Sequence, residues 1–544
     1  MATPRTRSKV DSHLATLGAA RARGGVSRRK AQGAHYTPPA LVRFVLEESL
    51  HGWKPGTEAC RVLDPACGSG NFLVEAARVL AHRDGVAVAR ILRERVFGVD
   101  IDPVAVKLAR AALLELLPPR TSEPTRRAVS RALVRNIAVG DALAMPPDRR
   151  FELIVGNPPF LNQLEKGTAA SRARARMIAE VTGGAVRRYT DLAAAFLLWG
   201  LARLAPRGRL GFVMPQSFLA TGDARSARDA AVGLARLRSI WSCEEPLFED
   251  ANVRVCTLVF EQGGVVQRRG GVQTRGVAQT RGGDRGGLRR AFGAEFAALR
   301  GSTPRPQAGD ESWASMLSEG FGAPRITLDP SGRCIADIAT ATADFRDQYY
   351  GLAGAVVENG AGPRLATTRH IGLAECAWGA CTARILGERY ERPTIEVDRL
   401  AGRKGMERWL AARLVPKVLV ATQTKVIEAF VDEQGEYAPL VPLITVVPRD
   451  GTDLWLLAAA IASPIVAARA RALYAGSALG AGAIKLSAKQ LLAMPLPQDR
   501  TAWNRSAELL RARDLPGFAR SSCEAHALSP RETRDVLHFW TSRL

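Results

Sequence analysis

The chain has 544 residues, which exceeds the usual size of one domain and predicts two or three domains, each with a large core. Its 76 Lys and Arg residues against 53 Asp and Glu residues give a formal charge of +23. This balance favours a polyanionic partner, nucleic acid before an anionic membrane surface. The eight cysteines are scattered and form no CxxC pair, so we expect no bound metal. Without a signal peptide or a long uncharged apolar run, we expect a reduced, cytoplasmic protein with no membrane segment.

Residues 1–32 are basic and contain few large apolar side chains. This composition is typical of an arm that becomes ordered on nucleic acid or of a disordered basic tail, and the sequence leaves both open. The segment from His35 to Pro39 then leads into an apolar helix that begins near Leu41. A turn at a helix N-terminus can present backbone N–H groups to a carboxylate.

The first apolar strand, residues 61–63, ends at the sequence DPACGSGNF, which runs from Asp64 to Phe72 and precedes a helix. A strand, a Gly-rich turn and a helix in this order allow a ligand to approach the backbone closely. The turn lacks the Lys-Ser/Thr ending of a phosphate-binding P-loop. The acidic residue at the strand end favours a cationic or hydroxyl-bearing ligand over a pyrophosphate.

Two further predicted strands also end at carboxylates. The strand 96–99 ends at Asp100, the position where a doubly wound sheet usually holds a ribose diol. Asp102 has the competing role of capping the helix that follows. The strand 137–139 is followed by Asp141. Because the carboxyl ends of parallel strands meet at one edge of a sheet, we expect these side chains to converge on one crevice.

A fourth predicted strand, residues 151–156, delivers Asn157, Pro158, Pro159 and Phe160 to the same edge. The Asn oxygen and the carbonyl of Pro158 can accept both N–H bonds of an amino group conjugated to a ring, and draw its nitrogen toward a tetrahedral shape. The nitrogen lone pair is then free to attack, while the Phe ring offers a face for a base removed from its helix. This predicts an adenine site, although a plain strand and Pro-Pro turn explain the tetrapeptide alone equally well.

The segments HYTPP, DPACGSGNF, GVDIDP, GDAL and NPPF, followed by GRLGFVMP, occur in an order that resembles the S-adenosylmethionine-dependent DNA adenine-N6 methyltransferases of the gamma arrangement. The resemblance covers roughly residues 33–262. It implies S-adenosylmethionine as cofactor, double-stranded DNA as partner, and transfer of a methyl group to the amino group of a flipped-out adenine within a specific site. Related proteins serve restriction–modification and phage defence.

The resemblance also assigns roles to individual residues. It implies that Thr37 and Asp64 flank the methionine end of the cofactor, that Asp100 binds the ribose, and that Asp141 bonds the adenine amino group of the cofactor. Phe160 departs from the Tyr of many members, but stacking survives without the hydroxyl. The catalytic residues expected on this basis are Asn157, Pro158, Pro159 and Phe160. The expected cofactor-binding residues are Tyr36, Thr37, Asp64, Ala66, Gly68, Gly70, Asp100, Ile101, Asp141 and Ala142.

The fold class that follows is α/β, a doubly wound Rossmann-like methyltransferase sheet followed by an α+β target recognition domain. The expected domains are a basic N-terminal arm (1–32), a methyltransferase domain (33–262), a Gly/Arg-rich linker or insertion (263–324) and a target recognition domain (325–544).

Smaller elements are also predicted. The Arg-rich residues 161–190 read as a loop, either closing over DNA or merely solvated. In the last domain we expect paired strands at 417–421 and 426–431, another strand at 440–447 and one long helix at 453–473.

Other functions use the same chemistry. Enzymes that methylate a guanine amino group in RNA or a protein glutamine share the Asn-Pro-Pro-aromatic pattern, but they are usually compact and lack a large basic C-terminal domain. A DNA-binding component of a phage-defence system is a further alternative, against which the complete set of site residues argues. We expect a monomer associated with the nucleoid, and the sequence leaves open a restriction or defence partner.

Overall fold

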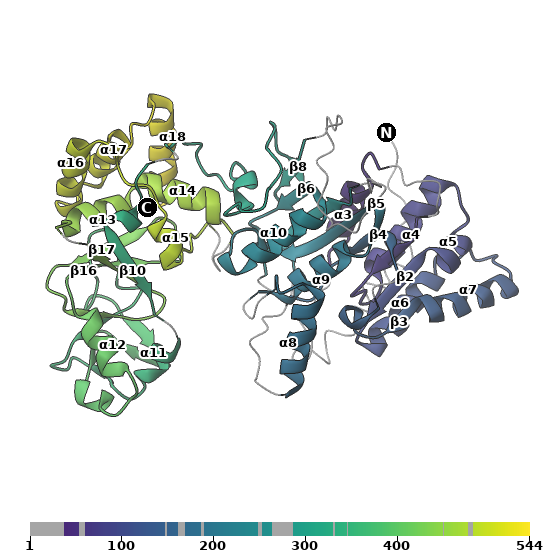
Figure 1. The fold of residues 1–544 in the computed structure, drawn as a ribbon, viewed down its shortest axis with the longest axis horizontal. Coiled ribbons are helices and arrows are strands. Elements are labelled where there is room, and N and C mark those ends of the chain that lie inside the picture. Colours follow the sequence, from purple (N-terminus) through teal and green to yellow (C-terminus); the bar gives the residue numbers. More distant parts are fainter. Residues whose placement is uncertain are drawn as a thin grey trace, which may run out of the picture. The chain divides into compact units, whose positions relative to one another are not determined.

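The computed structural model describes residues 37–53, 60–146, 149–160, 169–186, 190–248, 253–263, 287–329, 332–344, 346–449, 451–476 and 482–544. The chain divides into two compact units, residues 1–317 and 318–544 (Figure 1). The arm expected over residues 1–32 and the residues 264–286 of the expected linker lie outside the described residues.

Unit 1 contains a nine-stranded sheet with the order β3-β2-β1-β4-β5-β7-β6-β8-β9. The strands are β1 (Val62–Asp64), β2 (Val96–Asp100), β3 (Ile137–Val139), β4 (Phe151–Gly156), β5 (Leu204–Pro215), β6 (Arg236–Ser242), β7 (Val255–Glu261), β8 (Arg289–Phe292) and β9 (Ala297–Ala298). Strands β1 to β5 pair in parallel, whereas β7 runs antiparallel to β5 and β6. The strand order reverses at β1 and β4, which is where open α/β sheets bind ligands. The predicted doubly wound Rossmann-like sheet is confirmed.

Helices cover both faces of this sheet (Figure 1). They are α3 (Pro39–Leu50), α4 (Asn71–Asp84), α5 (Val88–Glu94), α6 (Pro103–Leu114), α7 (Glu123–Asn136), α8 (Ala169–Val181), α9 (Leu192–Leu201) and α10 (Arg225–Leu234). Neighbouring residues of β5 point to opposite faces. A Cβ atom added to Gly211 would meet Ser49 of α3, whereas one added to Gly200 of α9 would lie 2.6 Å from Leu210 Cδ1. Helices α3 and α9 therefore lie on opposite faces of β5.

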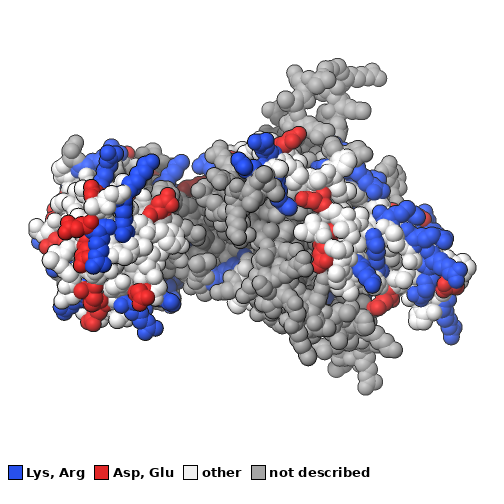
Figure 2. Space-filling view, turned by 90° about the horizontal axis from the view of Figure 1, so that it is seen from below, with Lys and Arg blue, Asp and Glu red and all other residues white. Residues whose placement is uncertain are grey.

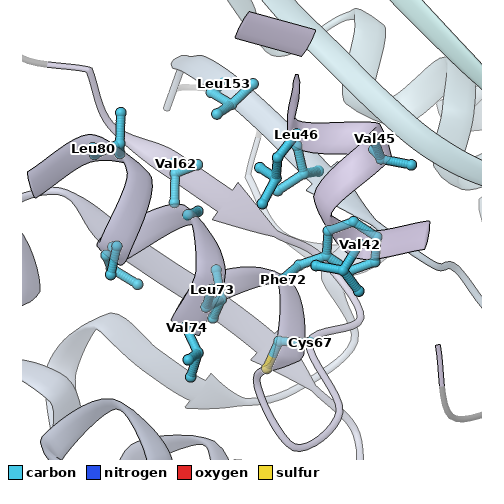
Figure 3. Packing of buried hydrophobic residues seen from close by; sticks show 14 of the residues in the cluster. Val42, Val45, Leu46, Val62, Cys67, Phe72, Leu73, Val74, Leu80 and Leu153 are labelled. Carbon is cyan, nitrogen blue, oxygen red and sulfur yellow. The ribbon is translucent and has the colours of Figure 1, made fainter. Parts of the chain in front are cut away.

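A shared apolar core packs α3 and α4 against β1, next to the Gly-rich turn. Figure 3 shows Val42 and Leu46 of α3 beside Phe72 and Leu73 of α4 and Val62 of β1, all of them buried. Burying each such side chain stabilises the fold by about 1.5–3 kcal/mol. The turn between β1 and α4 is thus fixed at both of its ends by the core.

The region 161–190, which we predicted as a loop, is in part helical. Residues 169–181 form α8, whose sequence AASRARARMIAEV is rich in Ala and Arg, both strong helix formers. The buried side chain of Ile178 packs the helix onto unit 1. The prediction was wrong here because it weighed the weak apolar periodicity above intrinsic helix propensity.

The second half of the expected linker also has regular structure. Strands β8 and β9 join the sheet of unit 1, and Trp313 is buried in the same unit. Arg290 anchors the segment, since its guanidinium donates to the carbonyls of Met316 and Arg300. The boundary between the units therefore falls after Leu317 rather than at 324.

Unit 2 combines two four-stranded sheets, ordered β10-β19-β16-β17 and β11-β15-β12-β18, with a separate hairpin β13-β14. The strands are β10 (Ala339–Ala343), β11 (Val356–Glu358), β12 (Arg364–Ala366), β13 (Ala383–Ile385), β14 (Glu388–Tyr390), β15 (Pro393–Ile395), β16 (Lys417–Ala421), β17 (Glu428–Asp432), β18 (Tyr437–Pro439) and β19 (Ile444–Pro448). The helices are α11 (Arg346–Gly351), α12 (Met406–Arg413), α13 (Leu454–Ala462), α14 (Pro464–Tyr474), α15 (Ala488–Leu492), α16 (Arg500–Arg511), α17 (Leu515–Ala525) and α18 (Pro530–Thr541).

Two expectations for unit 2 need correction. The strand expected at 440–447 is present only in its second half, as β19, because residues 440–443 form no strand. The long helix expected at 453–473 is broken into α13 and α14, because Ser463 caps the second helix by accepting from Val466 N and Pro464 begins it. The paired strands near 417–431 are present as β16 and β17, which are antiparallel.

No single helix in the described parts of the chain has the length and apolar composition needed to cross a membrane. Among the described helices, α13 and α14 have that length and composition only when they are counted as one, and the pair is bent by 47° at its break.

Candidate active site

The carboxyl ends of β1, β2 and β4 bring the predicted acidic residues next to Asn157. Gly68 N, in the turn after β1, donates to Asp100 Oδ2 at the end of β2, over 2.8 Å. A Cβ atom added to Gly156, the last residue of β4, would lie 2.6 Å from Asp64 Oδ1. Residue 156 must therefore lack a side chain for the Asp64 carboxyl to sit where it does. The expected convergence on one edge of the sheet is present.

The Gly-rich turn uses its glycines in two ways. Gly70 has φ of 93° and caps α4, and a Cβ atom there would lie 3.1 Å from Ala109 of α6. Gly68 has φ of 54°, and a Cβ atom there would meet nothing within 4 Å. Gly70 thus permits close packing of α4 against α6, while Gly68 leaves open space over the backbone for a ligand. Ala66 N is directed inward and donates to Asp64 Oδ1 over 3.0 Å.

Asp64 is a buried acid with no cationic side chain paired to it among the described residues. It is 2% exposed, and burial raises the pKa of its carboxyl to about 8. The Ala66 N–H lowers this pKa, and the negative charge of Asp100 raises it. At neutral pH the side chain is therefore mostly protonated in the free protein. A ligand that places a positive charge here would favour the ionised form.

The end of β2 combines fixed carboxylates with an exposed apolar side chain. Asp100 Oδ1 accepts from Asp102 N over 2.9 Å, so backbone N–H groups fix both of its oxygens and each keeps lone pairs for a hydroxyl. Asp102 caps α6 by accepting from Val104 N, as predicted. Between them, Ile101 is 54% exposed and offers an apolar surface to a flat ring.

Asp141 follows β3 and reaches the same edge. Its Oδ1 accepts from Leu143 N over 3.1 Å, and its Oδ2 lies 3.4 Å from the guanidinium of Arg174 on α8. Ala142 is buried beside it. A helix that the sequence did not predict thus places a cation beside one of the expected cofactor residues.

Asn157 has one satisfied and one unsatisfied polar atom. Its Nδ2 donates to Thr37 Oγ1 over 3.0 Å, and Thr37, just before α3, is 5% exposed. Its Oδ1 is buried and has no hydrogen-bond partner among the described residues. An unpaired buried acceptor costs about 1–3 kcal/mol, so a water or a ligand group is needed to complete it. Tyr36, the residue before Thr37, lies outside the described residues.

The other members of the tetrapeptide differ in burial. Pro158 is buried, while Pro159 and Phe160 are half-buried. Phe160 packs against the core of unit 1 and keeps part of its ring accessible. A ring supported by the core on one side can stack with a base on the other.

A cleft lies past the carboxyl end of β5, which pairs with β4 in parallel. The residues that line it are Thr190, Asp191, Ser217, Phe218, Thr221, Asp223 and Ala224. Arg228 is fully buried behind this wall and donates to the carbonyls of Phe218 and Thr221 over 2.8 and 2.9 Å. The sequence did not point to these residues as a site. Five of them, Ser217, Phe218, Thr221, Asp223 and Ala224, follow shortly after GRLGFVMP, whereas Thr190 and Asp191 precede α9.

The arrangement fits S-adenosylmethionine, which carries an ammonium group, a sulfonium, a ribose diol and an adenine ring. A buried acid, an open glycine backbone, a fixed carboxylate and an exposed apolar side chain are available to these groups in turn. Within the described ranges, no three His, Cys, Asp or Glu side chains are placed to hold a metal ion. All eight cysteines are free thiols.

The fold is a doubly wound Rossmann-like sheet, and the residues at its edge fit S-adenosylmethionine. Residues 25–274, somewhat less than half of the chain, match the family model described as N-6 DNA Methylase. This segment of the chain is therefore similar to the N-6 DNA methylase family. The similarity supports S-adenosylmethionine, the cofactor that the sequence predicted.

Two relatives and one structure illustrate the likeness. The Type II methyltransferase M.CvrRI of Paramecium bursaria Chlorella virus XZ-6E is 22% identical over 238 residues, which cover 43% of this chain and 50% of the relative. The Type II methyltransferase M.VspI of a Vibrio species is 28% identical over 209 residues, 38% of this chain and 42% of the relative. The chain thus spans about half the length of these relatives. The Type IIL restriction-modification enzyme MmeI in complex with DNA is 13% identical, with a TM-score of 0.55, over 94% of this chain and 77% of that one. At this identity the likeness concerns the fold alone.

Proposed function

We propose that the chain is a site-specific DNA adenine-N6 methyltransferase, which transfers a methyl group from S-adenosylmethionine to the amino group of an adenine flipped out of duplex DNA. The observation that carries this proposal is Asn157 Oδ1, a buried acceptor without a partner among the described residues, at the same sheet edge as the buried Asp64 carboxyl. An amino group can complete the acceptor, and a positively charged ligand favours the ionised form of the acid.

The role of Asn157 follows from its bond to Thr37. Because Nδ2 donates to Thr37 Oγ1, the side-chain amide is held with its oxygen toward the site. That oxygen and the carbonyl of Pro158 accept the two N–H bonds of the target amino group. The nitrogen lone pair, no longer conjugated with the ring, is then available for attack. No general base is needed before attack, since the proton leaves after the nitrogen has gained the methyl group.

The remaining residues bind and orient. S-adenosylmethionine, when bound, supplies a methyl group made electrophilic by the positive sulfur. Asp64 balances positive charge at the methionine end, and Asp100 accepts from the ribose hydroxyls. Asp141 accepts from the adenine amino group of the cofactor, while Phe160 stacks with the target base. Tyr36, Ala66, Gly68, Gly70, Ile101 and Ala142 complete the proposed cofactor site.

Duplex DNA is the partner that the charge of the chain favours. Figure 2 shows Lys and Arg side chains on the face that it draws, interspersed with Asp and Glu. We assign target recognition to unit 2. The simplest arrangement is a monomer that acts on the nucleoid in the cytoplasm. This arrangement is compatible with a separate restriction or defence partner.

The test is single-molecule sequencing of DNA from cells that contain the wild-type protein, Asn157→Ala or Asn504→Ala, scored for N6-methyladenine. Asn504 is an exposed residue of α16 and provides the matched control. We expect one methylated motif with the wild type and the control, and none with Asn157→Ala, which still binds cofactor and DNA. Full methylation by Asn157→Ala would refute the mechanism. If the wild type methylates no DNA motif but methylates RNA or a protein glutamine in vitro, the proposed DNA substrate is wrong and that molecule takes its place.

A further inference from the structure

The hairpin β13-β14 of unit 2 forms a two-stranded sheet of its own. Its strands are antiparallel and are joined by Leu386 and Gly387, whose φ values are 52° and 98°. Positive φ at both central residues is the pattern of a type I′ turn, which matches the twist of the flanking strands. The hairpin is therefore a well-defined ribbon that ends in a tight turn.

The register of the hairpin places two arginines opposite each other. Arg384 of β13 pairs with Arg389 of β14, and both side chains are exposed. Like charges directly opposite on a sheet destabilise it. Arg384 Nε donates to the carbonyl of Gly387 in the turn, over 3.1 Å. The side chain of Arg389 makes no hydrogen bond or ion pair with the described residues, so its guanidinium donors are available to a ligand.

The opposite face of the hairpin is anchored. Ala383 and Ile385 of β13 are at most 3% exposed and belong to the apolar core that also contains Leu352 and Ile395. The core and the alternation of side chains along a strand thus hold the ribbon with its two arginines pointing away from the core. Arg384 and Arg389 repel each other across the hairpin. A ligand with negative charge would remove this repulsion.

We propose that this hairpin enters the major groove of the target DNA and that Arg389 reads a guanine there. The inference rests on the proposed function and adds the recognition element to it. Two strands lie about 4.8 Å apart, and the major groove, about 12 Å wide, admits such a ribbon. Arg donates two hydrogen bonds to guanine O6 and N7, the commonest specific contact between protein and DNA. Arg384, held by its own turn, contacts the adjacent backbone or base.

The experiment compares Arg389→Ala, Arg389→Lys and the wild type on duplexes that carry the methylation motif, with each guanine replaced in turn. Lys keeps the charge but not the planar fork that binds guanine through two bonds. Arg534→Lys, at an exposed arginine of α18, is the matched control. The measured quantity is the ratio of kcat/KM for the intact motif to that for each substituted duplex. Thermal unfolding checks the fold, and we expect no loss of Tm in Arg389→Ala because it removes a like-charge pair.

We expect both variants at residue 389 to lose about 5-fold or more of the discrimination at one guanine and to keep it elsewhere. Loss in Arg389→Ala with full discrimination in Arg389→Lys would show a contact through charge alone and overturn the inference. Unchanged discrimination in both variants, or a wild-type motif without guanine, would overturn it as well. A wild-type protein that methylates no DNA would instead refute the proposed function beneath it.

Discussion

Replacing Asp64 by Asn should make the free protein more stable while it removes cofactor binding. The pKa of the buried carboxyl is about 8 against an ordinary value of 3.8. The unfolded chain therefore releases a proton above about pH 4 that the folded chain keeps until about pH 8. Stability of the wild type is fully present below pH 4 and is lost progressively as the pH rises toward 8.

The magnitude follows from this interval. At about 1.4 kcal/mol per pH unit, holding the proton at pH 7 costs the folded wild type about 4 kcal/mol relative to the unfolded chain. Asn is neutral at every pH, has nearly the same shape, and its oxygen can still accept from Ala66 N. We therefore expect Asp64→Asn to gain about 4 kcal/mol at pH 7. At about 2 °C per kcal/mol for a unit of this size, this is a rise in Tm of about 8 °C.

The assay is thermal unfolding of the two proteins at pH 5 and at pH 8, with and without S-adenosylmethionine. The Tm advantage of Asp64→Asn should be small at pH 5 and large at pH 8. Added cofactor should raise the Tm of the wild type alone, because only the ionised carboxyl balances a positive ligand. A Tm advantage that does not change with pH would refute the reasoning, as would a variant less stable than the wild type at pH 8.

The remaining predictions concern the same edge of the sheet. Thr37→Val removes the acceptor for Asn157 Nδ2 and should lower kcat about 10-fold, whereas Thr37→Ser keeps the hydroxyl and should retain activity; equal rates in single-turnover methylation would contradict this role. Gly156→Ala places a Cβ atom 2.6 Å from Asp64 Oδ1 and should abolish cofactor binding in calorimetry, while Gly233→Ala, with open space around it, should bind normally. Normal binding by Gly156→Ala would show that the Asp64 carboxyl does not need its observed position.

The parts of the site that the sequence predicted are those whose chemistry is local along the chain. A strand followed by an acid places that acid at a sheet edge whatever else surrounds it, so Asp64, Asp100 and Asp141 could be placed from short segments. Asn157 could be placed for the same reason. Asp102 was correctly assigned to a helix cap, because an acid directly before the first residue of a helix has that local role.

The parts that the sequence did not predict depend on contacts between distant segments. The bond between Thr37 and Asn157 joins residues 120 positions apart, and it decides which amide atom faces the site. The protonation of Asp64 depends on burial by several elements rather than on its neighbours in sequence. Likewise, Arg228 reads as a surface residue of an amphipathic helix, yet it is fully buried and supports the wall of the cleft.

Two features that cost the free protein stability lie within one short stretch of the sheet edge: a buried acid at Asp64 and, among the described residues, an unpaired acceptor at Asn157. Each could be removed by a single substitution that favours the fold, namely Asn at residue 64 or an apolar residue at 157. Packing does not explain why both lie at one edge. One ligand removes both costs if it places a positive charge at the acid and an amino group at the acceptor, and Gly156 leaves the space that the Asp64 carboxyl occupies. The stability cost and the proposed methyl transfer thus have the same structural origin.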